Sequence, residues 1–170
     1  MPDSHTIQHE LIRRFDLKPH PEGGFFSETH RSADCVVRAD GTAQMRSAST
    51  AIYYLLCDGA HSAWHRIRSD EVWHFYVGEP LHVHVLDAHG TLVTHKLGNA
   101  LTHPDAVFQA VVPAGSWFAA ECVDPATFAL VGCTVAPGFE FSEFELADVH
   151  ALKTRHPRHA MLIGRLGPAG

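Results

Sequence analysis

Short stretches in which apolar and polar residues alternate follow one another along most of the chain. Alternation with a period of two is typical of β-strands that bury one face and expose the other. The pattern predicts two strands that carry His65 and Glu71, and seven others over residues 25–31, 49–57, 81–87, 92–97, 107–112, 117–123 and 128–135. Many short strands at regular intervals favour an all-β fold, an antiparallel sandwich or barrel of the jelly-roll type.

Helical periodicity is confined to the two ends of the chain. Apolar residues near the N-terminus recur at intervals of one helical turn: Ile7, Leu11, Ile12 and Phe15. They predict an amphipathic helix that ends before Pro19. Residues 148–155 predict a short second helix, residues 164–170 a frayed end, and the polar residues 32–47 a loop that contains a turn.

No internal repeat and no linker divides the sequence, so we expect a single domain. Within it we distinguish an N-terminal helix at residues 1–17, a barrel at residues 18–146, and a C-terminal helix and tail at residues 147–170. A chain of 170 residues is long enough to bury roughly 70% of the surface that its unfolded form exposes.

Charge and composition limit the classes of partner that this protein is expected to bind. The net charge of −6 argues against nucleic acid, because phosphate binding requires a basic face. Lysine and arginine are scattered and the apolar runs are short, so we expect no membrane contact. The first ten residues lack the features of a signal peptide, which favours a cytoplasmic location. Without a C-x-x-C pair or a secretion signal, the four cysteines are expected to be thiols.

The residues best suited to chemistry lie in the segment 59–78, which is bounded by glycines. His65 and Glu71 stand six positions apart, and Ser69 with Asp70 predicts a turn between two strands. A hairpin of this kind aims His65 and Glu71 into the same space.

This segment resembles the first motif of the cupin superfamily. The motif spacing matches Gly59, His65, Glu71 and Gly78, with Ile67 where the second metal-binding histidine stands in cupins. Residues 113–118, with the sequence PAGSWF, are similar to the second cupin motif, and Phe118 takes the place of its histidine. The resemblance implies a cupin double-stranded β-helix.

Longer stretches are similar to one branch, cupin family five, whose function is unknown. They are PHPEGGFFSETHRS, STAIYYLL, VVPAGSWFAA and VGCTVAPGFEFSEFEL, and the similarity covers residues 18–146. Residues 22–31 also resemble, over a short stretch, the sugar-nucleotide 3,5-epimerases, which place a glutamate on a corresponding strand. That resemblance brings Glu28 into consideration as a second carboxylate.

The resemblance bears on metal binding, because cupin sites generally use three histidines and one glutamate. Ile67 and Phe118 have no lone pair to donate, so the usual site is reduced to His65 and Glu71. We therefore expect no cofactor. The alternative is a divalent transition metal on these two residues, completed by another histidine: His74, His82 or His84. His82 and His84 share a face of their strand, which we interpret as a polar outer face.

A pocket without a metal can still transfer protons. We predict His65 as a base with Glu71 as its partner, in a pocket with apolar walls and a few polar groups. The predicted ligand-binding residues are Glu28, Trp73, Phe75, Gln109 and Phe118.

Three functions remain open at the level of sequence. The favoured one is a protein that binds a small, carbohydrate-like or other polar organic molecule, as a metal-independent isomerase or epimerase. The others are a metal-dependent cupin enzyme such as a dioxygenase, and a binding module without turnover. His65 and Glu71 can also simply satisfy one another in the core. We further expect a homodimer, in which the strand at residues 25–31 extends a neighbour's sheet.

Overall fold

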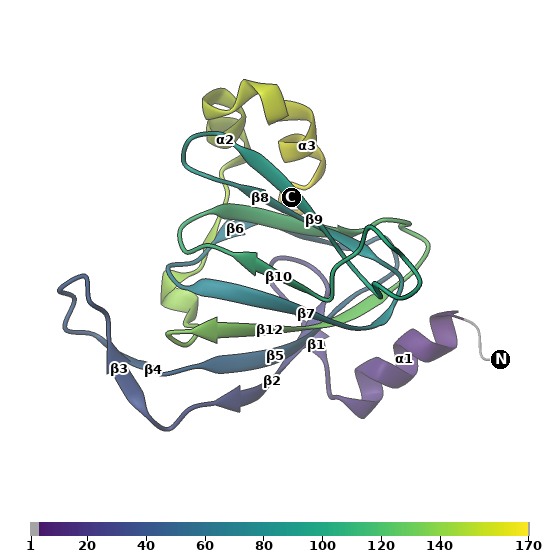
Figure 1. Ribbon diagram of the computed structural model, residues 1–170, viewed down its shortest axis with the longest axis horizontal. Coiled ribbons are helices and arrows are strands. Elements are labelled where there is room, and N and C mark those ends of the chain that lie inside the picture. The colour runs from purple at the N-terminus through teal and green to yellow at the C-terminus, as the bar shows by residue number, and fades with distance from the viewer. Residues whose placement is uncertain (1–3, 170) are drawn as a thin grey trace.

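Two antiparallel sheets stack face to face in a computed structural model that describes residues 4–169 (Figure 1). In spatial order the six-stranded sheet contains β1 (Lys18–Pro19), β2 (Phe25–Arg31), β5 (Thr50–Leu56), β12 (Ala129–Ala136), β7 (Asp70–Gly78) and β10 (Gln109–Val112). The five-stranded sheet contains β13 (Glu145–Leu146), β6 (His61–Arg66), β11 (Trp117–Cys122), β8 (Leu81–Leu86) and β9 (Leu92–Leu97). The expected all-β sandwich is thus confirmed.

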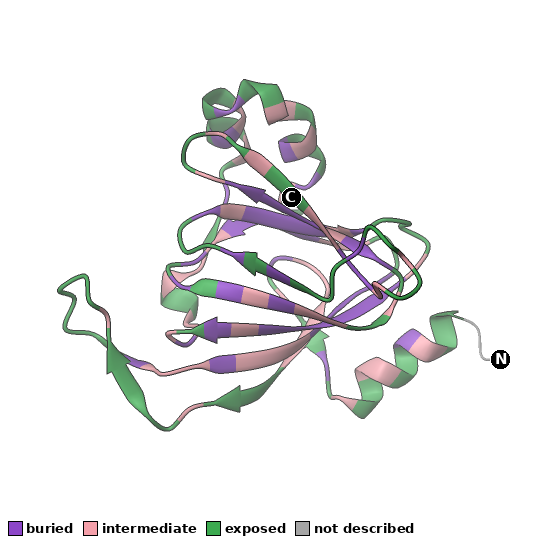
Figure 2. Cartoon of the chain, in the orientation of Figure 1, coloured by how far each residue is buried: buried purple, intermediate pink, exposed green. Residues whose placement is uncertain are grey.

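The alternating pattern places the core between the two sheets. Inward-facing residues of both sheets form the main cluster, with Trp73 and Phe118 among its largest fully buried side chains. Figure 2 shows that buried residues concentrate on the strands. Two smaller clusters cover the outer faces. The helix α1 (Ser4–Arg14) packs on the six-stranded sheet near Leu55, and α2 (Val149–Arg155) with α3 (Ala160–Arg165) packs on the five-stranded sheet near Trp64. No helix of the described residues has the length and apolar character that crossing a bilayer requires.

Two segments differ from their predictions. Residues 32–47, expected to be a loop, contain a hairpin of β3 (Cys35–Val37) and β4 (Met45–Ser47), which projects from the sandwich (Figure 1). Its turn is closed by a backbone hydrogen bond from Thr42 to the side chain of Asp40. The expected frayed end contains part of α3, and Leu166 is buried against the sheet. The residues of β3 are exposed, and hydrogen bonds from Arg38 and Arg46 to Glu143 tie the hairpin to the rest of the molecule.

The structure also corrects the expected hairpin between His65 and Glu71. The strands β6 and β7 are not paired with each other but belong to opposite sheets. The chain crosses between the sheets at residues 67–69, where Ser69 donates a hydrogen bond to the carbonyl of Pro137 at 2.7 Å. His65 and Glu71 therefore face the interior from two different sheets.

One edge of the six-stranded sheet is largely unpaired, which favours the predicted homodimer. The short strand β1 pairs only with Phe25 and Phe26, so the remainder of β2 presents an open edge. Open edges favour pairing with another strand. We expect sedimentation at tens of micromolar to give twice the 18.7 kDa of one chain. A mass of one chain at that concentration would contradict this expectation.

Candidate functional site

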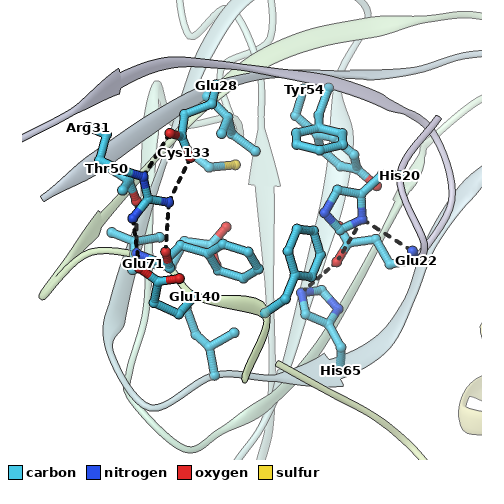
Figure 3. A pocket seen from close by; sticks show the side chains of 16 residues that line it. His20, Glu22, Glu28, Arg31, Thr50, Tyr54, His65, Glu71, Cys133 and Glu140 are labelled. Carbon is cyan, nitrogen blue, oxygen red and sulfur yellow. Dashed lines mark hydrogen bonds and ion pairs between the residues drawn. The ribbon is translucent and has the colours of Figure 1, made fainter. Parts of the chain in front are cut away.

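A cavity of about 80 Å³ lies between the sheets and reaches the protein surface. Figure 3 shows its polar side chains in two groups on opposite sides. His20, Glu22 and His65 form one group, and Glu28, Arg31 and Glu140 lie on the other side, where Glu71 is also found (Figure 3). Apolar side chains, including Phe26, Ile52, Ile67 and Val135, complete the walls.

His65 and Glu22 form a buried ion pair on the first side. The Nε2 atom of His65 lies 3.0 Å from Oε2 of Glu22, and both side chains are less than one-tenth exposed. On the other side of the ring, Nδ1 of His65 donates to the carbonyl of Ala63 at 2.7 Å. Ser62 donates to the second oxygen of Glu22 at 2.9 Å. The orientation of the imidazole is therefore fixed at both ring nitrogens.

A glycine turn brings Glu22 to this position. Gly23 and Gly24 have φ angles of 112° and 71°, which favour glycine. A Cβ atom on Gly23 would lie 2.1 Å from the carbonyl oxygen of His61, so the turn passes directly against β6. A hydrogen bond from the amide of Ala63 to the carbonyl of Glu22, at 2.8 Å, holds the turn there.

Electrostatics favour the charged forms of this pair. Burial alone lowers the pKa of His65, but the carboxylates of Glu22 and Glu71 outweigh burial and raise it. Burial likewise raises the pKa of Glu22, but the charge and hydrogen bond of His65, with His20 and Ser62, lower it overall. Both shifts act in the direction that favours an imidazolium paired with a carboxylate.

Glu71 has the opposite electrostatic character. Burial raises its pKa from 4.5 to about 7, and the negative charge of Glu22 acts in the same direction. The charge of His65 and nearby groups of Cys133 and Trp73 only partly offset this. A carboxyl group with a pKa near 7 exchanges protons readily at neutral pH, as a general acid–base group must.

The other side of the cavity holds a partly exposed cation. Arg31 donates two hydrogen bonds to Glu28, both at 2.9 Å, and one to Glu140 at 2.9 Å. It also donates to the carbonyl of Phe139 at 3.0 Å. The guanidinium is thus surrounded by acceptors, and the two carboxylates exceed its single charge. This side of the cavity therefore does not present a free cation to a ligand.

The seven residues predicted from the sequence fall into four groups, of which Gln109 is the last. His65, Glu71 and Glu28 line the cavity. Phe118 does not line the cavity, but it packs against the ring of His65, with ring centroids 3.9 Å apart. Trp73 and Phe75 belong to the surrounding core and do not line the cavity.

The position expected for Gln109 is wrong. Gln109 is exposed on the outer face of the six-stranded sheet, where its side chain lies 3.2 Å from Nδ1 of His74. The strand β10 is an edge strand, and its inward residues are Ala110 and Val112, which belong to the core. Gln109 therefore lies on the exposed face of this strand, and the face that points into the core is the opposite of the expected one.

Sequence reasoning missed Glu22 and His20. In the structure the backbone amide of Glu22 donates to Nδ1 of His20 at 3.2 Å, and the His20 side chain is 7% exposed. The one available signal was a carboxylate directly before two glycines, since such a pair allows a close backbone approach.

The donor set of the cavity does not fit the metal that most cupins bind. Both ring nitrogens of His65 face hydrogen-bond acceptors, which leaves no lone pair for an ion. Ile67 and Phe118 offer none. Within residues 4–169, the group of three close metal-binding side chains lies elsewhere, at His82, His84 and Glu121.

The comparisons with known proteins agree with this architecture. The sandwich is that of the cupin superfamily, and the family described as "Cupin superfamily (DUF985)" matches residues 9–147. The chain therefore belongs to cupin family five. No curated protein is similar enough to count as a match. The resemblance to the sugar-nucleotide 3,5-epimerases stays a prediction.

Two solved structures resemble nearly the whole chain. A hypothetical protein from Leishmania major is 30% identical with a TM-score of 0.85, and the alignment covers 95% of this chain and 98% of that one. A protein from Shewanella oneidensis is 34% identical with a TM-score of 0.82, covering 95% and 97%. A variant of oxalate decarboxylase from Bacillus subtilis is 15% identical with a TM-score of 0.53, covering 87% of this chain and 36% of that one. This last likeness shows the fold alone.

Proposed function

We propose that the cavity binds a small, neutral, polar organic molecule and transfers protons on it without a metal ion in the barrel. The observation that carries this proposal is a carboxyl group with a pKa of about 7, that of Glu71, in the same cavity as the buried pair of Glu22 and His65. One group exchanges protons at neutral pH, and the other is a protonated imidazole held in a fixed orientation.

The chemistry that suits this arrangement is proton transfer at a carbon next to a carbonyl. Glu71 as the carboxylate takes a proton from the carbon, and the positive charge of the paired His65 ring stabilises the developing enolate oxygen, because both ring N–H groups are already bonded to Ala63 and Glu22. Return of a proton from water to the other face gives an epimer, and Glu71 then passes its proton to the hydroxide left behind. Return of the proton by Glu71 to the neighbouring carbon, with the hydroxyl proton passing between the two oxygens, gives an isomer. Atoms and charges balance, because the enzyme returns to its starting protonation state.

Size and charge narrow the class of ligand. A volume of about 80 Å³ holds roughly five to eight water-sized groups. This favours a short-chain hydroxy-carbonyl compound. Glu22, Glu28 and Glu140 supply three negative charges, against two positive charges on His65 and Arg31. The excess of carboxylates disfavours anions such as sugar nucleotides.

Hydrogen exchange from D₂O tests the proposal directly. Short aldoses, ketoses and hydroxy-ketones are incubated with the protein in D₂O at pH 7, and loss of the proton signal next to the carbonyl is followed by NMR. We expect exchange with at least one compound, and a loss of roughly a hundredfold in Glu22→Gln. Glu79→Gln, an exposed glutamate at the end of β7, is the matched control and should exchange normally.

The same measurements separate the other two functions. A protein that binds a compound in a thermal-shift screen but never exchanges its protons is a binding module. Exchange that requires added metal and is lost with a chelator identifies a metal enzyme instead. Either result contradicts proton transfer by Glu71 and His65 alone.

A further inference from the structure

A second polar cluster lies on the outer face of the five-stranded sheet, away from the barrel cavity. The apolar residues of β8 point into the inner core, so the intervening residues His82 and His84 face outward. Glu121 of the neighbouring strand β11 stands directly opposite His82 in the sheet register. One ligand atom from each of the three residues lies within 4.8 Å of the other two.

We propose that His82, His84 and Glu121 bind a divalent transition metal ion, with Zn²⁺ as the best fit. Two imidazoles and a carboxylate are ligands that suit Zn²⁺, and three protein ligands leave one tetrahedral position open. Ca²⁺ and Mg²⁺ prefer oxygen ligands alone and suit this set poorly. The site is separate from the position that a cupin metal takes inside the barrel.

Neighbouring side chains already orient two of the three ligands. Nδ1 of His84 lies 2.8 Å from the hydroxyl of Thr94 on β9, which can accept a hydrogen bond and leave Nε2 for the metal. Arg165 of α3 donates to both oxygens of Glu121, one of them at 2.8 Å. Nε2 of His84 lies 3.0 Å from Glu121, so the metal takes the place of the proton that joins them.

A purely structural role of the cluster does not explain the presence of His82. Glu121 and His84 tie α3 to the sheet, but the ring of His82 has no hydrogen bond to any residue between 4 and 169. Its ring lies beside the ring of His84, with centroids 5.6 Å apart. His82 is half-buried and borders a cavity of about 470 Å³, which has room for water at the open metal position.

The surrounding cations are each neutralised. Lys96 stands opposite His82 in the register, but its ammonium group pairs with Asp105 at 2.9 Å. The charge of Arg165 is matched by Glu121. The cluster therefore carries no uncompensated positive charge that would repel a divalent ion at this distance.

Titration of the metal-free full chain with ZnCl₂, followed by calorimetry, tests the site. We expect one equivalent of saturable binding, and a rise in unfolding temperature with added Zn²⁺. His82→Ala should abolish both effects, and because His82 makes no hydrogen bond, the variant should melt normally without metal. Thr94→Val should weaken binding by about 10- to 100-fold, since it removes only the orienting partner of His84.

Two control variants keep the result decisive in a chain with 15 histidines. His89→Ala removes an exposed histidine at the turn after β8, and it should bind Zn²⁺ as the wild type does. Glu71→Gln, which changes the other possible ligand in the barrel without the expected loss of stability, should also retain the equivalent. The proposal is overturned if the wild type shows no saturable binding, if His82→Ala still binds one equivalent, or if Glu71→Gln alone loses it.

Discussion

At pH 8 the Glu71→Gln variant should be more stable than the wild type, while proton transfer in the cavity falls by roughly a hundredfold to ten-thousandfold. Both effects arise from the same carboxyl group. Burial raises the pKa of Glu71 from 4.5 to about 7, so at pH 8 the folded protein holds an ionised carboxylate in a site that disfavours it. A difference of this size corresponds to about 3 kcal/mol.

The sign of the pH dependence follows from proton uptake. In the unfolded chain Glu71 loses its proton near 4.5, whereas in the folded protein it keeps the proton up to about 7. Between these values the unfolded state binds fewer protons, so the contribution of Glu71 to stability falls as pH rises. Glutamine has no ionisable group, so the Glu71→Gln variant does not lose stability in this way as pH rises.

Denaturant unfolding at pH 5 and pH 8 measures the effect. The advantage of Glu71→Gln over the wild type should be small at pH 5 and reach about 3 kcal/mol at pH 8. This corresponds to roughly 6–12 °C in the unfolding temperature of a chain of this size. Glu79→Gln should show no such difference between the two pH values. An equal stability of Glu71→Gln and the wild type at pH 8 would exclude a raised pKa for this carboxyl.

The strands were predictable because buried and exposed residues alternate along them with a period of two. Residues 25–31 and 92–97 have the expected bounds, and most of the others differ by one or two positions. The alternation of apolar and polar residues does not indicate which sheet a strand joins. A separation of six positions between His65 and Glu71 suits a hairpin and a crossover between sheets equally well, and the choice depends on contacts such as that of Ser69 with Pro137.

The site was only half predictable for a similar reason. His65 and Glu71 lie in a recognisable motif, but the partner of His65 is Glu22, which comes from a turn far away in the sequence. Ser62, which also contacts Glu22, is 40 positions from it. The outer cluster has the same character, since Glu121 is 37 positions from His84 and meets it only through the pairing of β8 with β11. Local periodicity contains no information about such pairs.

The largest loss of stability is expected for His65→Ala, at about 3–5 kcal/mol. Removal of the imidazole leaves the carboxylate of Glu22 buried, with Ser62 and the more distant His20 as its remaining neighbours. A buried charge without its counterion is far more costly than the intact pair, because the lost hydration is no longer offset. The unfolding temperature should fall by roughly 6–20 °C. His30→Ala, which removes an exposed histidine on β2, should change it little.

A double-mutant cycle with Glu22→Ala shows whether this loss comes from the pair itself. If the unpaired carboxylate is the cause, the double variant should be less destabilised than the sum of the single variants, by about 0.5–3 kcal/mol. The deficit of His65→Ala should also be smaller at pH 5 than at pH 8, because Glu22 can then take up a proton. Additive losses, or a deficit that does not change with pH, would mean that His65 stabilises the barrel by packing against Phe118 and not through its charge.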